Sequence, residues 1–243
     1  MKAWQTAETN LHDLQQNPYP GRGLVAGRAS SGDAWLMVYW IMGRSAHSQN
    51  RRFVSEGGVL RTEPVDVAQV VDPSLIIYEA MLELPGIYLV SNGDQTRTLY
   101  ETLQAGGTFD QALRQREREP DAPNYTPRIS AMLDLRESPG TLALSILKAN
   151  LADPAKTDRF TYRPALPPPG LGRGLTTYLG DGTPLPSFQG DPLWLPLAAS
   201  AKESLDVYWD ALDACNRVAL AVKRIPLRGG PSEIVVRNRF RDR

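Results

Sequence analysis

The chain has 243 residues, enough for one large β-rich or mixed domain with a buried core. Its 27 basic and 27 acidic residues leave no net charge, so no overall field attracts nucleic acid or an anionic membrane, and a charged ligand must be bound locally. The single cysteine, Cys215, excludes an internal disulfide and a cysteine metal cluster, and His12 and His47 lack metal-ligand spacing.

The N-terminal segment predicts an extension over residues 1–20, followed by a single domain over residues 21–243. Because residue 1 is Met, no exposed N-terminal nucleophile is encoded. Residues 22–28 and the apolar run 34–42 predict a hairpin with a buried face. That run is too short to cross a bilayer as a helix, and no secretory segment precedes it, so we expect a soluble, cytoplasmic protein.

A polar segment with three arginines follows the second strand, from Arg44 to Arg52. Guanidinium groups present forked donors that match phosphate oxygens, so this segment is a candidate phosphate site. A solvated loop accounts for the same composition, and the sequence leaves both interpretations open. Residues 57–65 predict the next strand.

Two further strands are predicted at residues 75–82 and 87–90. Pro85 and Gly86 between them suit the central positions of a type II turn, so these strands should form a hairpin. Tyr78 would lie on the first strand, either as a core residue with a satisfied hydroxyl or as a catalytic group.

The second strand leads into the polar turn Ser91-Asn92-Gly93 and then into a helix over residues 94–105. A strand-to-helix turn leaves backbone N–H groups without helical partners, and Ser91, Asn92 and Thr96 lie beside them. The turn therefore suits an anion or a polar heterocycle. An ordinary helix cap with a satisfied Asn is the structural alternative.

A second helix is predicted from the capping box at Thr108 to about Arg118. The loop at residues 121–129 follows, and its two prolines, Pro123 and Pro127, stiffen the backbone. A stiff loop holds its polar side chains in fixed directions at little entropic cost, which suits a binding site.

The rest of the chain predicts antiparallel strands and one more helix, so the fold class is α+β, with antiparallel sheets covered by helices. A capping box at Ser200 opens that helix, which should run to about Cys215. The expected strands are 141–148, 159–163, 217–225 and 234–236, with a Pro/Gly connector at 164–174, an extended segment at 184–188 and a frayed tail at 237–243.

A series of short motifs is similar to the archaeal-type IMP cyclohydrolase family, in the same order and at similar intervals. The similarity covers roughly residues 21–225, and its later pieces resemble the longer bacterial members. Single motifs such as Ser-Asn-Gly are weak, and the combination is specific. The motifs are Gly21-Arg22, Gly27-Arg28, Arg44-Ser45, Asn50-Arg51, Tyr78, Ser91-Asn92-Gly93, Thr96, Asn124 to Arg128, Thr177-Tyr178 and Pro184 to Phe188.

The resemblance implies a four-layer αββα sandwich similar to the N-terminal nucleophile hydrolases, without their nucleophile. It also implies IMP cyclohydrolase activity, in which 5-formamidoimidazole-4-carboxamide ribotide loses water to give IMP in purine biosynthesis. The partner would be this purine ribotide, with no nucleic acid and no membrane, and the reaction requires no cofactor and no metal. The oligomeric state is left open, a homo-oligomer included.

The resemblance also implies site residues. Tyr78 and Glu119 would transfer protons, with Asp121 as the substitute for Glu119, and Arg51 would act on developing charge. Arg44, Arg51 and Arg128 would share the phosphate or oxyanion charge, and Asn124 to Thr126 would contact the imidazole carboxamide. The full binding set is Arg28, Arg44, Ser45, Asn50, Asn92, Gly93, Thr96, Asn124, Tyr125, Thr126 and Arg128.

Two alternatives remain beside cyclohydrolase activity. One is a related hydrolase of another purine nucleotide, and the other is a non-catalytic nucleotide-binding protein, which needs the arginines and the stiff loop but no proton-transfer pair. Nucleic-acid binding would depend on the arginine-rich stretches at 114–118 and 237–243, whose first stretch is interleaved with acidic residues.

Overall fold

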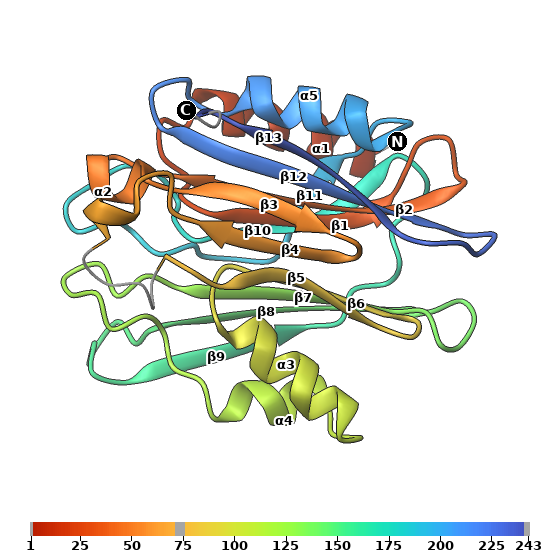
Figure 1. The fold of residues 1–243 in the computed structure, drawn as a ribbon, viewed down its shortest axis with the longest axis horizontal. Coiled ribbons are helices and arrows are strands. Elements are labelled where there is room, and N and C mark those ends of the chain that lie inside the picture. Colours follow the sequence, from red (N-terminus) through yellow and green to blue (C-terminus); the bar gives the residue numbers. More distant parts are fainter. Residues whose placement is uncertain (1, 71–75, 241–243) are drawn as a thin grey trace.

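Two antiparallel sheets form the centre of the protein in the computed structural model, which describes residues 2–70 and 76–240 (Figure 1). Sheet A has the strand order β11-β10-β1-β2-β12-β13, and sheet B runs in order from β3 to β9. Sheet A comprises β1 (Gly23–Arg28), β2 (Ala34–Met42), β10 (Leu171–Thr176), β11 (Leu193–Pro196), β12 (Arg217–Pro226) and β13 (Glu233–Asn238). Sheet B comprises β3 (Arg52–Glu56), β4 (Val59–Glu63), β5 (Glu79–Leu84), β6 (Ile87–Ser91), β7 (Arg128–Asp134), β8 (Thr141–Ala149) and β9 (Thr157–Tyr162).

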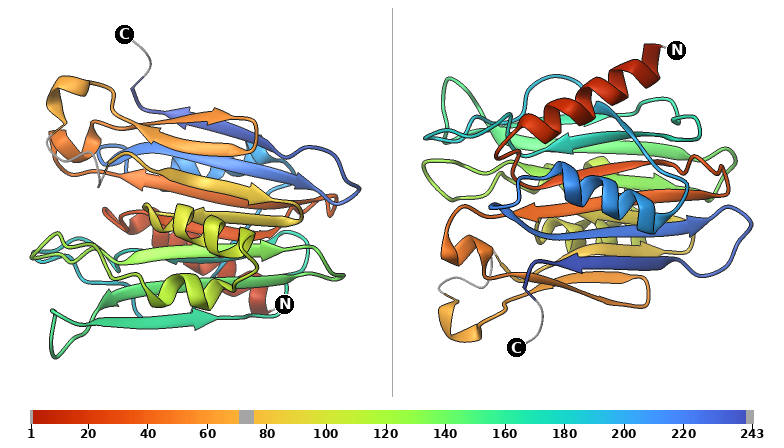
Figure 2. Two further views of the ribbon diagram at one scale, coloured as in Figure 1. Left: turned by 60° about the horizontal axis from the view of Figure 1, so that its bottom comes forward. Right: turned by 90° about the horizontal axis from the view of Figure 1, so that it is seen from above.

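Helices cover the outer face of each sheet, which gives four layers. In Figure 1, α1 (Lys2–Gln16) and α5 (Ala201–Ala211) lie on sheet A, and α3 (Gln95–Gln104) and α4 (Phe109–Arg114) lie on sheet B. Figure 2 shows α1 and α5 side by side over sheet A when the molecule is seen from above. One apolar cluster fills the space between the sheets, and two more lie under the helix layers. The short elements α2 (Ala46–Gln49) and η1 (Val67–Gln69) lie outside the layers.

Strand β2 explains why the apolar run at 34–42 does not alternate. Its odd-numbered residues, such as Tyr39, face the cluster between the sheets, whereas its even-numbered residues, such as Trp40, face the cluster under α1 and α5. Every residue of β2 is buried. A strand covered on both faces needs apolar side chains on both, so the run is continuous. The prediction of this strand is confirmed at both ends.

Four strands, β3, β7, β10 and β11, lie where the sequence predicted none. Residues 128–134 form β7, a central strand of sheet B, although residues up to 129 were assigned to the stiff loop. Residues 171–176 form β10, although 164–174 were predicted as a connector. Strand β10 contains glycines, which have low β propensity, so its sequence does not indicate a strand. The glycines are needed for close packing, because a Cβ on Gly172 would lie 2.7 Å from the Val25 side chain.

Smaller corrections concern element ends. The strand predicted at 57–65 is β4 alone, because residues 57–58 form the turn from β3. The helix at Thr108 has the predicted capping box but ends at Arg114, and the helix at Ser200 ends at Ala211 rather than near Cys215. Residues 2–16, expected only as an extension, form α1. The strand predicted at 75–82 begins at Glu79; Leu75 and the tail residues 241–243 lie outside the described residues.

Candidate functional site

A pocket of about 400 Å³ lies where several strand ends meet. The register of sheet A brings the start of β1 beside the ends of β2 and β10, and that of sheet B brings the end of β6 beside the start of β7. The loops from these ends form the wall. The lining side chains used below are Tyr19, Arg22, Arg44, Arg51, Glu119, Asp121, Asn124, Thr126 and Tyr178.

One part of the pocket is cationic and is formed by the segment between β2 and β3. Arg51 is 7% exposed and donates to the backbone carbonyls of Ser48 at 2.9 Å and Met42 at 3.2 Å. Among the described residues, no carboxylate forms an ion pair with Arg51, so its charge is free to attract an anion. Arg44 lies 4.9 Å from the ring centroid of Tyr19 and forms an ion pair with the half-exposed Asp181.

A buried ion pair lies in the wall of the pocket. The Arg22 guanidinium donates to the Glu119 carboxylate at 2.8 Å, and the two side chains are 9% and 5% exposed. Arg22 also donates to the carbonyl of Asn92 at 2.9 Å. Burial disfavours the charge, but the Glu119 carboxylate outweighs it and raises the pKa of Arg22 well above its ordinary value. Arg22 therefore stays charged and keeps its donors aimed at Glu119.

A hydrogen-bonded chain occupies the wall formed by the loop between α4 and β7. The Asp121 carboxylate accepts from the Thr126 N–H at 2.7 Å and from the Thr126 hydroxyl, and the Thr126 hydroxyl is 2.5 Å from the Tyr178 hydroxyl. Thr126 and Tyr178 are 4% and 5% exposed. Burial raises the pKa of Tyr178, so its phenol stays protonated at neutral pH. The side-chain amide oxygen of Asn124 accepts from the Leu185 N–H at 3.1 Å and so ties the same loop to residue 185.

Tyr78 lies behind this wall and pairs with Tyr39 from β2. Their hydroxyl oxygens are 2.7 Å apart, and Tyr78 is 6% exposed. Burial, and then the neighbouring Tyr78, raise the pKa of Tyr39 well above its ordinary value. Tyr78 is not among the described residues that line the pocket. The charge of Arg22 acts on both phenols, so the pair is electrostatically part of the site.

The turn at 91–93 supports the pocket from behind. The Asn92 amide is satisfied within the protein, because it accepts from the Ile129 N–H at 2.8 Å and donates to the Pro127 carbonyl at 2.8 Å. The Thr96 hydroxyl donates to the carbonyl of Gly93 at 2.9 Å. These bonds match the structural alternative for the turn, in which the polar residues serve folding.

Arg128 belongs to the same support. Its guanidinium donates to Asp94 at 2.7 Å and to the side-chain oxygen of Gln95 at 2.8 Å. Burial lowers the pKa of Arg128, against the opposing effect of Glu119 and Asp94. A Cβ on Gly93 would lie 2.6 Å from the Arg128 guanidinium, so a glycine there lets Arg128 approach the turn.

The structure brings six of the predicted site residues into the pocket and four more directly behind it. The six are Arg44, Ser45, Arg51, Glu119, Asn124 and Thr126, and the four are Tyr78, Asn92, Gly93 and Arg128. Thr96 lies farther from the pocket than Gly93, and its hydroxyl donates a hydrogen bond to the Gly93 carbonyl.

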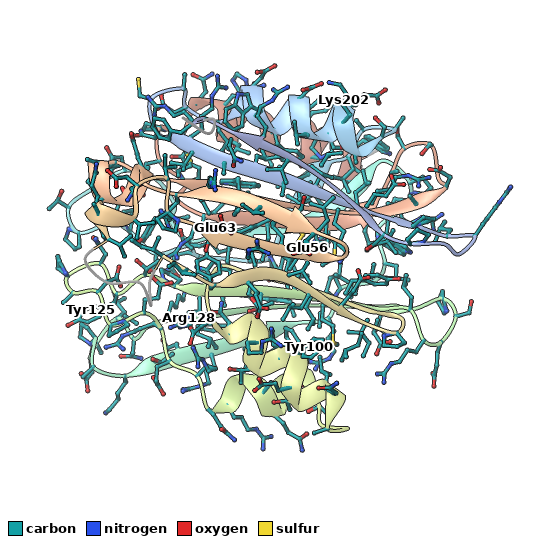
Figure 3. All side chains as sticks on the ribbon, in the orientation of Figure 1. Glu56, Glu63, Tyr100, Tyr125, Arg128 and Lys202 are labelled. Atoms are coloured by element: carbon teal, nitrogen blue, oxygen red, sulfur yellow. The ribbon has the colours of Figure 1, made fainter. Side chains whose placement is uncertain are left out.

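Three predicted residues lie away from the pocket. Arg28, at the far end of β1, donates to the carbonyl of Gly32 and lies 5.2 Å from the Trp35 ring centroid. The Asn50 side chain bonds both ways to the backbone of Asp66. Tyr125 stacks under the Arg118 guanidinium, and Figure 3 shows it at the edge of the molecule, farther out than Arg128. The order of the motifs along the sequence does not indicate whether a side chain points into the pocket or away from it.

Three of the nine pocket side chains named above had no predicted role. Arg22 and Tyr178 entered the sequence analysis only as parts of the resemblance, and Tyr19 only within the N-terminal extension. The sequence signal for Arg22 was its position, since it is a charged residue between Gly21 and the apolar strand that begins at residue 23. Tyr178 packs over Gly21, where a Cβ would lie 2.5 Å from the Tyr178 ring, and stacks on Tyr19 with 6.0 Å between ring centroids.

Within residues 2–70 and 76–240, no helix has the length and apolar character needed to span a membrane. The same residues contain no cluster of three or more His, Cys, Asp or Glu side chains arranged to bind a metal ion.

The family model described as "IMP cyclohydrolase-like protein" matches residues 19–228, which include every pocket residue named above. No curated protein matches the chain.

Proposed function

We propose that this chain, which belongs to the IMP cyclohydrolase-like protein family, closes the ring of 5-formamidoimidazole-4-carboxamide ribotide to give IMP and water. The observation that carries the proposal is the polarity of the pocket. Arg44 lies at one part of its wall with Arg51, which no described carboxylate pairs, and Glu119, Asn124 and Thr126 lie at another. A ribotide has the matching polarity, with a phosphate at one end and a polar heterocycle at the other.

The phosphate belongs beside Arg51 and Arg44 in this proposal. Charge-assisted hydrogen bonds from guanidinium to phosphate are about twice as strong as neutral ones. Arg51 is held in place by two backbone carbonyls and has donors left for a ligand. Arg128 is already engaged with Asp94 and Gln95, so we assign it to supporting the Gly93 turn rather than to the phosphate.

The reacting groups belong beside Glu119 and the loop of Asn124 and Thr126. The carboxamide nitrogen attacks the formyl carbon of the same molecule, so holding the two groups in contact supplies much of the rate. Arg22 keeps the Glu119 carboxylate oriented, and a carboxylate so held can accept a proton from one of the two substrate nitrogens. Tyr78 remains the second proposed proton-transfer group, because it interacts electrostatically with Arg22 from outside the pocket lining.

The four layers support a further part of the proposal. Two antiparallel sheets between helix layers fit the αββα arrangement of the N-terminal nucleophile hydrolases. We propose that the chain uses this arrangement as a single domain over residues 21–243, with residues 1–20 as an N-terminal extension whose helix α1 packs on the outer face of sheet A.

Direct turnover tests the proposal. Purified protein is incubated with the formamido ribotide, and IMP formation is followed by absorbance and chromatography. The expected result is IMP formation that needs no added cofactor, with Arg28→Gln as a fully active control because Arg28 lies outside the pocket. No IMP from the wild-type protein contradicts the proposal.

Tyr78→Phe separates catalysis from binding alone. A catalytic role predicts a loss of turnover of at least about 100-fold with IMP affinity retained. A parent protein that binds IMP without turning over the ribotide, with binding unchanged in Tyr78→Phe, supports a non-catalytic nucleotide-binding protein. Turnover of a different purine nucleotide supports the related hydrolase.

A further inference from the structure

The ring closure requires two nitrogens to lose a proton, and Glu119 provides one acceptor. The carboxamide nitrogen loses a proton as it attacks, and the nitrogen that carries the formyl group loses another as the C=N bond forms. Both protons end in the water that leaves. A second route for protons must therefore reach the pocket, and this inference rests on the proposed function.

The chain of Asp121, Thr126 and Tyr178 has a fixed hydrogen-bond direction. An ionised carboxylate only accepts, so the Thr126 hydroxyl gives its one proton to Asp121. The Thr126 oxygen must then accept from the Tyr178 hydroxyl, 2.5 Å away. The Tyr178 oxygen is left with its lone pairs for the pocket that it lines. A phenol that donates inward and accepts from the pocket is suited to receive an N–H of the ligand.

The packing around Asp121, Thr126 and Tyr178 keeps these three side chains in fixed positions. Thr126 and Tyr178 are nearly fully buried, so water competes little for their hydrogen bonds. The Thr126 N–H fixes the second oxygen of the Asp121 carboxylate at 2.7 Å. The Tyr178 ring packs closely over Gly21 and stacks on the Tyr19 ring. If these residues only stabilised the loop, the hydrogen bonds between Asp121 and Thr126 would suffice, and the Tyr178 hydroxyl would not be needed.

We propose that Tyr178 accepts the carboxamide proton and that Thr126 and Asp121 take it up through a relay. As the C–N bond forms, the π pair of the formyl C=O moves to its oxygen. The amide proton goes to the Tyr178 oxygen, the phenol proton goes to Thr126, and the Thr126 proton goes to Asp121. Tyr178 is the catalytic residue, since it touches the substrate, and Asp121 is a positioning residue that acts through Thr126.

The elimination step returns the proton and balances the reaction. The proton on Asp121 travels back through Thr126 and Tyr178 to the former formyl oxygen. That oxygen leaves as water with this proton and with the one from the nitrogen that carried the formyl group, which passes through the Glu119 carboxylate in the pocket wall. The N–H pair becomes the C=N bond, and the C–O pair leaves with the water.

Single-turnover kinetics with the formamido ribotide test the relay, because they isolate the chemical step. Tyr178→Phe keeps the stacked ring and removes the oxygen, and Thr126→Val removes the hydroxyl at constant shape. Both should lower the single-turnover rate at least about 100-fold with IMP affinity unchanged, and Thr126→Ser should restore most of the rate. Tyr208→Phe is the matched control, because Tyr208 is also buried but donates to the carbonyl of Pro196 away from the pocket.

A proton inventory distinguishes the relay from a structural role. In mixtures of H₂O and D₂O, the wild-type single-turnover rate should curve with the deuterium fraction, because several protons move together. The curvature should be lost in Tyr178→Phe. A linear wild-type inventory, or a Tyr178→Phe variant as fast as wild type, overturns the relay alone. A wild-type protein that forms no IMP overturns the proposed function, and the relay with it.

Discussion

The Arg22 guanidinium and the Glu119 carboxylate meet at 2.8 Å although 97 positions separate them in the chain. Arg22 precedes β1 in sheet A, and Glu119 lies between α4 and β7 beside sheet B. The pair therefore bridges the two halves of the sandwich at the pocket. Both residues are buried, 8% and 4% exposed, so each charge depends on the other for the solvation that water would give.

Removing Arg22 should destabilise the protein strongly. Arg22→Met leaves the Glu119 carboxylate buried without its partner, which costs about 3–5 kcal/mol in comparable pairs. The double variant Arg22→Met with Glu119→Gln should recover a large part of this loss, because no unpaired charge remains. Urea unfolding measures the free energies of both variants. A double variant no more stable than Arg22→Met argues that the cost is packing rather than charge.

Arg51 should contribute more to ligand affinity than Arg128. Arg51→Gln removes a guanidinium that no described carboxylate pairs, and loss of a charge-assisted hydrogen bond costs about 1.5–3 kcal/mol, or about 10–150-fold in the IMP dissociation constant. Arg128→Gln should weaken binding less, because Arg128 is bonded to Asp94 and Gln95. Calorimetric titration with IMP measures both, and Arg28→Gln is the control. A larger loss in Arg128→Gln would move the phosphate to the Gly93 turn.

Gly21→Ala should damage the pocket itself. Gly21 has φ of +72°, and an added Cβ would lie 2.2 Å from the Thr177 hydroxyl and 2.5 Å from the Tyr178 ring. The backbone strain and the overlap together should cost at least about 1–3 kcal/mol and displace Tyr178. Thermal unfolding and IMP binding measure the two effects. Gly180→Ala is a matched control, because its Cβ meets only an ordinary contact at 3.6 Å and its φ is not in the left-handed region; equal losses in both variants would contradict the role of Gly21.

Glu83 should make the stability depend on pH in the acid range. Burial opposes its charge, but hydrogen bonds from Lys223 and Ser232 lower the pKa of Glu83 below its ordinary value. The folded state then binds fewer protons than the unfolded state, so stability rises with pH. This contribution is present above about pH 4.3, the ordinary value for Glu, and is lost as the pH falls through the lowered folded-state pKa.

Glu83→Gln should therefore flatten the acid limb of the stability curve. Urea unfolding at a series of pH values between neutrality and about pH 3 gives the slopes. The exposed Glu8→Gln on α1 is the control and should keep the wild-type slope. A Glu83→Gln variant with the wild-type slope would show that other carboxyl groups carry the acid dependence.

The sequence by itself determined the elements whose signals are local. The run at 34–42 is apolar on both faces because both faces of β2 are covered. The capping box at Thr108 and the turn at Gly86, with φ of +75°, follow from contacts within a few residues. The antiparallel α+β class followed from hairpins of this kind. The resemblance added the family, and the family model agrees with it.

Only the tertiary structure decided which side chains meet. Strand β7 and the glycine-rich β10 form because neighbouring strands complete them, and neither has a strong signal of its own. Arg51, Arg28 and Arg128 are alike as residues, yet Arg51 lines the pocket, Arg28 lies at the far end of β1 and Arg128 is bonded to Asp94. The physical reason is that a side chain's partner depends on strand register and on which loops lie together across the two sheets. These contacts join positions far apart in the chain, such as Arg22 and Glu119, which are 97 residues apart, and no local pattern encodes them.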